Sequence, residues 1–339
     1  MKLDAGKVRF GIIGCGIIAD VHARVVALLS EAELIGVTDV NREHAKRFAA
    51  RHHCRAYESI EALLRDDKID AVCICTPSGL HAEQAIQTAR AGKHVFVEKP
   101  MALKLDDVDR MVTVCEENEV LLSTVFPRRM SPHARFARKF IQDGRLGKLS
   151  LCSAYVKIYR DQAYYDSAGW RGTWKMDGGG VMMNQGIHTV DLLQWLVGPV
   201  VSLSGKAKTV LRSIEVEDTA AAILQFENGA MGVLEMTTTA HPSKGQRLEI
   251  HGNKGTLVIE EDHIVALEIE GEEAVKLPPL DDFKVVPDGH LLQLKDFAEA
   301  IQDGRMPIVP GTAGRHSLAI ILGTYTSSSL GREVVLPDM

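Results

Sequence analysis

The chain has 339 residues, 45% of them hydrophobic and 25% charged, and 39 basic against 45 acidic side chains give it a formal charge of −6. This length suggests about two domains, and the composition argues against a disordered chain and against a nucleic-acid binder that relies on net positive charge. The sequence lacks an apolar run of the ~20 residues that a membrane span needs, a signal-peptide layout and a disulfide framework. We therefore expect a cytoplasmic protein with ordinary buried thiols and no metal site.

Strand-like and helix-like segments alternate through the first 125 residues. The strand-like runs lie at 8–14, 33–39, 70–76, 93–99 and 120–126, and segments with apolar residues at helical spacing lie between them, at 20–29, 41–52, 60–66, 81–92 and 105–118. Strands that are apolar throughout and alternate with helices form parallel sheets covered on both faces. We therefore expect an α/β nucleotide-binding domain over residues 1–125.

The pattern changes after Phe126 to long alternating strands. These strands lie at 149–160, 201–212, 219–238, 246–261 and 265–277, and the last three carry hairpin signals at 228–229, 252–255 and 270–271. One amphipathic helix is expected at 187–196, and two more, at 290–302 and 312–328, could pack back on the first domain. Residues 126–339 thus predict an α+β domain with a large, mostly antiparallel open sheet, which binds substrate and mediates oligomerisation.

A G-x-G-x-x-A string joins the first strand to the first helix. Gly14 would allow the tight turn, Gly16 would let the backbone approach a pyrophosphate, and Ala19 would permit close packing of helix and strand. The helix N-terminus, which includes Ile17 and Ile18, supplies amide donors and a favourable dipole for phosphate groups. The string therefore predicts a dinucleotide site.

An acidic residue supports this interpretation. Asp39 lies 20 residues beyond Ala19, at the end of the second strand, where a carboxylate accepts from the ribose hydroxyls of NAD and repels the 2′-phosphate of NADP. The alternatives are that Asp39 caps the next helix, and that nearby Arg42 contacts a phosphate. We expect NAD as the cofactor, with NADP less favoured.

Two further motifs follow the next strands. Thr76 and Pro77 come after one strand, with His81 close behind, and Glu98 and Lys99 come after the next. Because ligands of open α/β sheets bind at the carboxyl ends of the strands, we expect all five to contact the cofactor. Lys99 would be a fixed cation beside the nicotinamide ribose, and the alternative is an ordinary surface lysine.

A third motif covers residues 170–188. Three glycines at 178–180 precede a helix, which suits close approach of a ligand to the backbone. Asn184 and His188 are four residues apart and would share a helix face, and Asp191, three residues further on, could orient the imidazole. His188 is therefore a candidate proton acceptor, although a single histidine at a helix start is more often structural.

Together these segments resemble the glucose–fructose oxidoreductase / inositol dehydrogenase (Gfo/Idh/MocA) family. The resemblance rests on GIIGCGIIA, TPSGLH, EKP, GGGVMMNQGIHTVDLLQWL and the order of the two halves, and it covers essentially the whole chain. It implies a Rossmann domain followed by an α+β domain, with Lys99 and His188 on the reacting hydroxyl. Inositol dehydrogenase-like members carry Asp at the position of Asn184, and the block that begins with Trp170 and Arg171 looks closer to UDP-N-acetylglucosaminuronate 3-dehydrogenases. Those two residues and Asn184 are thereby candidate substrate contacts.

The predicted reaction is hydride transfer from a secondary alcohol of a sugar, sugar derivative or cyclitol to NAD. His188, with an unperturbed pKa of ~6.5, would accept the hydroxyl proton, and Lys99 would stabilise the developing alkoxide, although the two roles could be exchanged. The alternatives are a reductase of a keto-sugar or diol-type substrate, and a catalytically silent sugar- or NAD-sensing regulator.

Basic residues cluster in sequence around the expected substrate segments. They could meet a carboxylate or a phosphate, or be ordinary solvated charges. The cluster comprises Arg128, Arg129, Lys157, Arg160, Arg171 and Lys175.

The second half also predicts assembly. In the strand at 219–226, Ala221 and Ile223 face one side, and the alternate residues, which are also apolar, face the other. Apolar residues on both faces of a strand imply that both faces are covered, whereas the expected helices suffice for one. We therefore expect the sheet to pack against its copy in a homodimer, or in a homotetramer of such dimers.

Overall fold

The computed structural model describes residues 6–280 and 282–337, which form two compact units. The first unit contains residues 6–127 and a second segment from later in the chain, residues 284–314. The second unit contains residues 128–280 and 282–283 and continues from 315 to 337. The chain therefore passes from the first unit to the second, returns, and leaves again.

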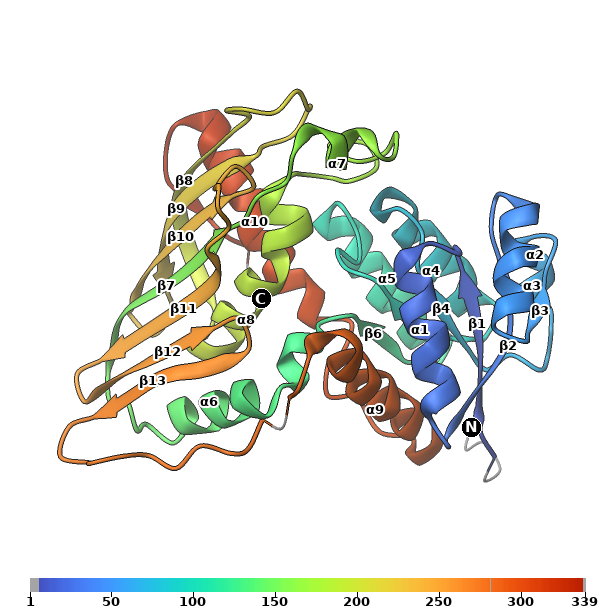
Figure 1. The fold of residues 1–339 in the computed structure, drawn as a ribbon, viewed down its shortest axis with the longest axis horizontal. Helices are drawn as coiled ribbons and strands as arrows, with labels where there is room; N and C mark the ends of the chain where they lie inside the picture. Colours follow the sequence, from blue (N-terminus) through green and yellow to red (C-terminus); the bar gives the residue numbers. More distant parts are fainter. Residues whose placement is uncertain (1–5, 281, 338–339) are drawn as a thin grey trace. The chain divides into compact units, whose positions relative to one another are not determined.

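The first unit is built on six parallel strands in the order β3-β2-β1-β4-β5-β6 (Figure 1). The strands are β1 (Val8–Ile13), β2 (Ala32–Thr38), β3 (Arg55–Ala56), β4 (Ala71–Ile74), β5 (His94–Val97) and β6 (Leu122–Thr124). This order is that of the doubly wound dinucleotide-binding fold, in which the strand order reverses between β1 and β4. The parallel sheet predicted from sequence is confirmed.

The described residues of this unit contain six α-helices. They are α1 (Ile17–Leu28), α2 (Arg42–Arg51), α3 (Ile60–Leu64), α4 (His81–Arg90), α5 (Leu105–Glu117) and, from the returning segment, α9 (His290–Asp303). Short turns η1 (Ser78–Leu80) and η4 (Val285–Gly289) precede α4 and α9, and η2 (Pro127–Met130) follows β6.

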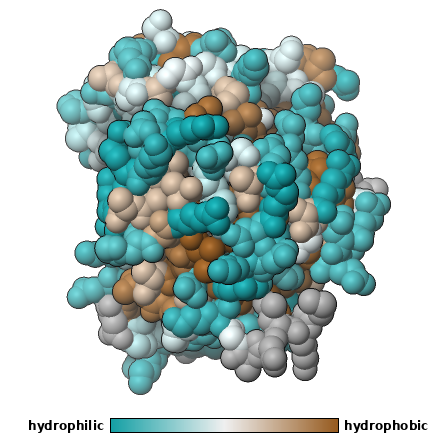
Figure 2. Space-filling view, turned by 90° about the vertical axis from the view of Figure 1, so that its right-hand side faces the viewer, coloured by the Kyte–Doolittle hydropathy of each residue, from teal (hydrophilic) through white to brown (hydrophobic). Residues whose placement is uncertain are grey.

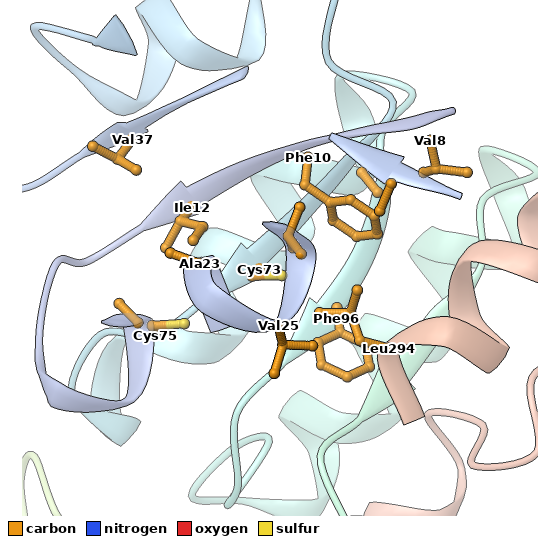
Figure 3. Packing of buried hydrophobic residues seen from close by; sticks show 14 of the residues in the cluster. Val8, Phe10, Ile12, Ala23, Val25, Val37, Cys73, Cys75, Phe96 and Leu294 are labelled. Atoms are coloured by element: carbon orange, nitrogen blue, oxygen red, sulfur yellow. The ribbon is translucent and has the colours of Figure 1, made fainter. Parts of the chain in front are cut away.

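The core of the first unit joins the sheet to α1 and α9. In Figure 3, Phe10 and Phe96 from the sheet lie with Val25 of α1 and Leu294 of α9, and all four are almost fully buried. Burying side chains of this size stabilises a fold by roughly 1.5–3 kcal/mol each. Cys73 of β4 and Cys75, which directly follows β4, lie in the same core as free thiols.

The second unit is built on eight strands in the order β13-β12-β11-β7-β10-β9-β8-β14 (Figure 1). They are β7 (Leu149–Lys157), β8 (Val200–Lys208), β9 (Thr219–Phe226), β10 (Met231–Thr237), β11 (Gly245–Gly252), β12 (Gly255–Glu260), β13 (His263–Ile269) and β14 (Val334–Val335). Within this second sheet, only the pairing of β10 with β7 is parallel among the described strands. The large, mostly antiparallel sheet is therefore confirmed.

The helices of this unit are α6 (Pro132–Gln142), α7 (Gln162–Asp166), the π-helical segment η3 (Val181–Gly186), α8 (Ile187–Val197) and α10 (Ala313–Leu330). Helix α8 packs on β7 and β11, and α10 lies over β8, where Ser327 of the helix accepts from the Gly205 amide. These helices cover one face of the sheet.

Two expectations for this half were wrong. Helix α6 was not predicted, and the segment after Gly271, predicted as the second arm of a hairpin, forms no strand. Pro278 and Pro279, which lack the amide hydrogen that a strand would donate, directly follow this arm, and the Pro278 carbonyl accepts from His133 of α6. The chain thus leaves the sheet edge to run over that helix.

No helix in residues 6–280 and 282–337 is long and apolar enough to cross a bilayer. Hydrophilic residues dominate the face drawn in Figure 2, with hydrophobic residues interspersed among them. Groups of three or more histidine, cysteine or acidic side chains that could hold a metal ion are also absent from these residues.

Candidate functional site

The glycine turn between β1 and α1 is open to an anion. Gly14 has φ +90°, and a β-carbon there would lie 2.9 Å from the Cys75 backbone, so this position requires glycine. A β-carbon on Gly16 would meet nothing within 4 Å, and α1 begins at Gly16 without a side-chain cap. The first amides of α1 are therefore left to bind a phosphate.

The first turn of α1 presents apolar side chains beside this opening. Ile17 is 84% exposed and Ile18 is half-buried. An exposed isoleucine at a helix start gains no packing within its own chain, which is consistent with the predicted contact to a cofactor.

Asp39 follows β2 and holds the turn in place. One carboxylate oxygen accepts from the Cys15 amide at 2.8 Å and the other from the Asn41 amide at 2.8 Å. Asn41, not Asp39, caps α2, since its side chain accepts from the His44 amide. Each Asp39 oxygen keeps a lone pair with which it can accept from a ribose hydroxyl.

His81 links the two loops that follow β4 and β5. Its ring nitrogens lie 2.7 Å from the Pro100 carbonyl oxygen and 2.8 Å from that of Thr76, and the residue is 1% exposed. Thr76 and Pro77 are half-buried. The ring thus links the two loops, and both of its nitrogens lie beside backbone carbonyl oxygens of the protein instead of facing a cofactor.

Glu98 likewise points into the protein. It is 6% exposed, and its carboxylate lies 2.7 Å from Nε2 of the fully buried His22 and accepts from the Lys99 amide at 3.2 Å. Burial alone would raise the pKa of this carboxyl, but the hydrogen bond from His22 and the charges of the neighbouring histidines and Lys99 lower it to about 2. Glu98 therefore stays ionised and anchors the backbone from which the half-buried Lys99 side chain extends.

The histidines behind Glu98 were not recognised from sequence. The ring centroids of His22 on α1 and His290 on α9 are 5.5 Å apart. Burial, followed by the nearby His22, lowers the pKa of His290. The only sequence signal for His22 is its place on the face of α1 that turns toward the sheet.

In the second unit, a buried carboxylate fixes the glycine segment. Glu217 is 2% exposed and accepts from the amides of Gly180 and Met182, both at 2.9 Å, and from the Tyr325 hydroxyl at 2.9 Å. A β-carbon on Gly180 would lie 1.6 Å from the Glu217 carbonyl oxygen. Burial raises the pKa of Glu217. This contact sets the start of η3 and hence of the segment that continues into α8.

Asn184 lies in η3 and His188 in the first turn of α8, and both are half-buried between buried neighbours. The Asn184 amide donates to Asp177 at 2.9 Å, and the other Asp177 oxygen accepts from the Gly172 amide at 2.9 Å. Asp177 thus ties Asn184 to the loop that follows Trp170 and Arg171. Arg171 itself lies over the Trp170 ring, 4.7 Å from its centroid.

The expectation that Asp191 orients His188 was wrong. Asp191 is 1% exposed. Its carboxylate accepts hydrogen bonds from Nε and Nη2 of Arg129, at 2.7 and 2.6 Å, and from the Ser317 hydroxyl at 2.8 Å. The carboxylate therefore ties α8 to η2 and α10. Asp191 does lie three residues after His188 on the same helix, but its carboxylate binds the Arg129 guanidinium, 62 positions earlier in the chain.

The candidate residues therefore divide between the two units. The glycine turn, Asp39, Thr76, Pro77 and Lys99 lie in the first unit, and Trp170, Arg171, Asn184 and His188 lie in the second. The first group is suited to a dinucleotide, and the second presents an amide, an imidazole and a guanidinium, which can bind and deprotonate hydroxyl groups.

Known proteins resemble both halves. A model of an oxidoreductase family with an NAD-binding Rossmann fold (GFO_IDH_MocA) matches residues 8–126, and the GFO/IDH/MocA C-terminal domain matches residues 134–258. Inositol 2-dehydrogenase of Rhizobium meliloti is 30% identical over 96% of this chain and 98% of its own. Myo-inositol 2-dehydrogenase of Thermotoga maritima is 28% identical over 95% and 96%.

A solved structure agrees closely with the fold. The WlbA dehydrogenase from Bordetella pertussis, in complex with NADH and UDP-GlcNAcA, superposes with a TM-score of 0.90 at 37% identity, over 98% of this chain and 100% of the other. The resemblance stated from the sequence motifs is thereby confirmed.

Proposed function

This chain belongs to the Gfo/Idh/MocA family of NAD-binding oxidoreductases, and on that premise we propose that Lys99 and His188 carry its chemistry. The protein is an NAD-dependent dehydrogenase that acts on a secondary hydroxyl of a sugar, sugar derivative or cyclitol. Hydride transfer is reversible, so the same two residues would also serve reduction of the corresponding ketone.

The proposed roles follow from the charge that develops on the substrate. The glycine turn and Asp39 would hold NAD, which would supply the hydride acceptor for the carbinol carbon. His188 takes the hydroxyl proton, which removes positive character from that carbon and accelerates the step by roughly 10²–10⁴-fold. Lys99 donates a hydrogen bond to the same oxygen and stabilises it as negative charge grows. Asn184, which both donates and accepts, holds a neighbouring hydroxyl.

The observation that carries this proposal is the way in which the two basic residues are mounted. The backbone amide of Lys99 donates to the buried Glu98 carboxylate. The segment before His188 is held in the same way, because its backbone amides donate to the buried Glu217 carboxylate. Both side chains remain partly accessible. A buried carboxylate that binds backbone amides fixes the loop from which the reactive side chain extends, as a preorganised site requires.

The cofactor half of the proposal rests on Asp39. Its carboxylate closes the glycine turn and lies where ribose hydroxyls would donate to it. The 2′-phosphate of NADP would meet this negative charge. We therefore assign NAD preference to Asp39, with Gly14, Gly16, Ile17 and Ile18 lining the pyrophosphate site.

The open face of the second unit's sheet supports assembly of copies of this chain. Ile223 and Met231 on that face are 55% and 50% exposed, whereas Leu224 and Leu234 on the helix-covered face are 1% exposed. We propose a homodimer, or a homotetramer of such dimers, formed through this face. The free cysteines of the described chain suit a reducing compartment, consistent with a cytoplasmic enzyme.

A substrate panel tests the proposed reaction. The purified protein is mixed with NAD and with myo-inositol, neutral aldoses, uronic acids or UDP-linked sugars, and reduced cofactor is followed by its absorbance. We expect NADH formation with at least one member. If NAD binds but no alcohol is oxidised and no matching ketone is reduced, the sensor alternative replaces the enzyme.

A further inference from the structure

Three arginines close to the Asn184–His188 segment lack an acidic partner. Arg160, Arg171 and Arg212 are half-buried, and among the described residues none of them lies within ion-pairing distance of a carboxylate, whereas Arg145 of the same unit pairs with Glu272. A half-buried charge without a counter-charge is unfavourable. These arginines therefore differ from the ordinary ion pairs of the second unit.

Aromatic rings hold the three guanidinium groups together. Arg160 and Arg171 both lie over Tyr164, at 5.2 and 4.7 Å from the ring centroid, so their guanidinium carbons are within about 10 Å of one another. Arg212 lies over Tyr159 at 5.1 Å, and its Nε donates to the Arg160 carbonyl at 2.7 Å. The rings support the charges through cation–π contact but do not neutralise them.

The cluster also presents unused hydrogen-bond donors. Nε of Arg160, Nε of Arg171 and Nη2 of Arg212 are buried and have no acceptor in the described part of the chain. The Tyr164 hydroxyl accepts from Arg171 at 2.8 Å and from Gln185 at 3.2 Å, which leaves its own hydrogen to donate. Buried donors in native proteins almost always have partners. A bound anion would satisfy these donors and offset the mutual repulsion of the three charges.

This cluster is continuous with the segment that carries the reactive imidazole. Gln185, which donates to Tyr164, directly follows Asn184. Asp177 joins Asn184 to the Gly172 amide, and Gly172 directly follows Arg171. The arginines and the hydroxyl-binding residues thus belong to one hydrogen-bonded set within the second unit.

We propose that Arg160, Arg171 and Arg212 bind the phosphoryl groups of a phosphorylated or nucleotide-linked sugar. A single carboxylate would compensate one of the three charges, whereas a diphosphate carries enough negative charge and enough oxygens for several guanidinium forks. A neutral cyclitol would leave the cluster uncompensated. The inference rests on the proposed function in that the sugar ring attached to these phosphates is the one that Asn184 and His188 engage.

Calorimetric titration of UDP tests the subsite. The protein is first saturated with NADH, so that UDP cannot occupy the dinucleotide site. We expect UDP to bind, and R160Q, R171Q and R212Q each to weaken its affinity by about 10-fold, the scale of a lost charge-assisted hydrogen bond. R171K, which keeps the charge but loses the fork, should fall between wild type and R171Q. R145Q is the matched control, because Arg145 is also stacked on a ring, Phe140, but is paired with Glu272.

Other outcomes separate the anion sources. Binding of glucuronate without binding of UDP would replace the phosphoryl ligand by a carboxylate and overturn the proposal. Binding of UDP that is equal in wild type and in all three glutamine variants would overturn it as well. Circular dichroism and thermal melting establish that each variant is folded, and the lysine variants of all three positions serve if a glutamine variant is not.

The test also separates the subsite from the proposed reaction. If UDP binds in the expected way but no sugar reduces NAD, the proposed function fails and the subsite stands. If neutral sugars reduce NAD at rates that R160Q, R171Q and R212Q leave unchanged, and UDP does not bind, the function stands and the subsite fails.

Discussion

Asp39 has two tasks that different substitutions can separate. Its carboxylate supports the glycine turn through the Cys15 amide, and its charge opposes a 2′-phosphate. Asp39→Asn keeps an oxygen that can accept from the amide and removes the charge, so it should raise affinity for NADP relative to NAD with little loss of stability. Asp39→Ala should narrow the preference as well, but also loosen the turn. Fluorescence titration with both cofactors measures this, and tighter binding of NADP than of NAD by the unsubstituted protein would contradict the assignment.

Lys99 and His188 should affect turnover far more than cofactor binding. Lys99→Ala and His188→Ala are each expected to lower kcat at least ~10²-fold, the usual scale for a lost acid–base or oxyanion partner, while NAD affinity and melting temperature stay close to wild type. Steady-state kinetics over a range of pH values provides the measurement. Near-normal turnover of His188→Ala across that range would show that another residue accepts the proton.

Glu98 should make stability depend on pH in the acid range. Its pKa is about 2 in the folded protein against 4.5 for an ordinary glutamate, so the folded state favours the ionised form. The stabilisation is therefore fully present above pH 4.5 and is lost as the pH falls toward 2, an effect on the order of 3 kcal/mol. Glu98→Gln should melt well below wild type at pH 7, and the gap should shrink below pH 4.5. Glu83→Gln, on an exposed position of α4, is the control, and a gap that does not change with pH would refute the role of the ionised carboxylate.

At the scale of elements, the turn before η3 requires glycine at position 180, where a β-carbon would not fit. Gly180→Ala would place a methyl group 1.6 Å from the Glu217 carbonyl, which forces the turn away from its carboxylate support. We expect a loss of kcat as large as that of the catalytic variants, with NAD binding preserved, because the first unit is untouched. Gly169→Ala, in the same stretch but with open space around it, should behave as wild type. Full activity of Gly180→Ala would show that the geometry of η3 does not control the reaction.

Local spacing explains which parts of the fold and site were predictable. The glycine turn, Asp39 and the EKP motif lie at fixed distances within consecutive strand–helix units, so their position follows from the order of elements alone. The contact of Glu217 with Gly180 spans 37 positions and that of Asp191 with Arg129 spans 62. Such contacts depend on how strands and helices pack, which a single sequence does not encode as a spacing.

The missed helix α6 has a similar cause. Its buried side includes Ala134, Ala137 and Phe140, which do recur at helical spacing. Alanine contributes little to a hydrophobic pattern, and the three basic side chains of the segment obscure what remains. The helix is stabilised in place by its partners, which include α8 and the Pro278 carbonyl.

At the scale of the whole molecule, the open sheet face should determine the assembly. Light scattering at micromolar concentration is expected to give a mass of at least twice the 37.1 kDa of one chain. Ile223→Glu, in the middle of the open face, should shift that mass toward one chain, because a charge would be buried in an apolar contact. Leu211→Glu introduces the same charge at a position that is 65% exposed outside the sheet and should leave the mass unchanged. A concentration-independent mass of one chain for the unsubstituted protein would exclude the assembly.

The returning segment has a consequence for the order in which the protein is made. Leu294 and Phe297 of α9 fill the core beneath β1, and Gln293 binds the backbone at Thr124 and Phe126. When synthesis has passed Pro127, every strand of the parallel sheet has therefore been made, but helix α9, which completes the core of that sheet, has not. At ~5–20 residues per second, the 187 residues from Pro127 to Gly314 take roughly 10–40 s to synthesise. During that interval the nascent chain carries an exposed apolar groove over β1 and α1, so the growing polypeptide should engage chaperones there until α9 emerges.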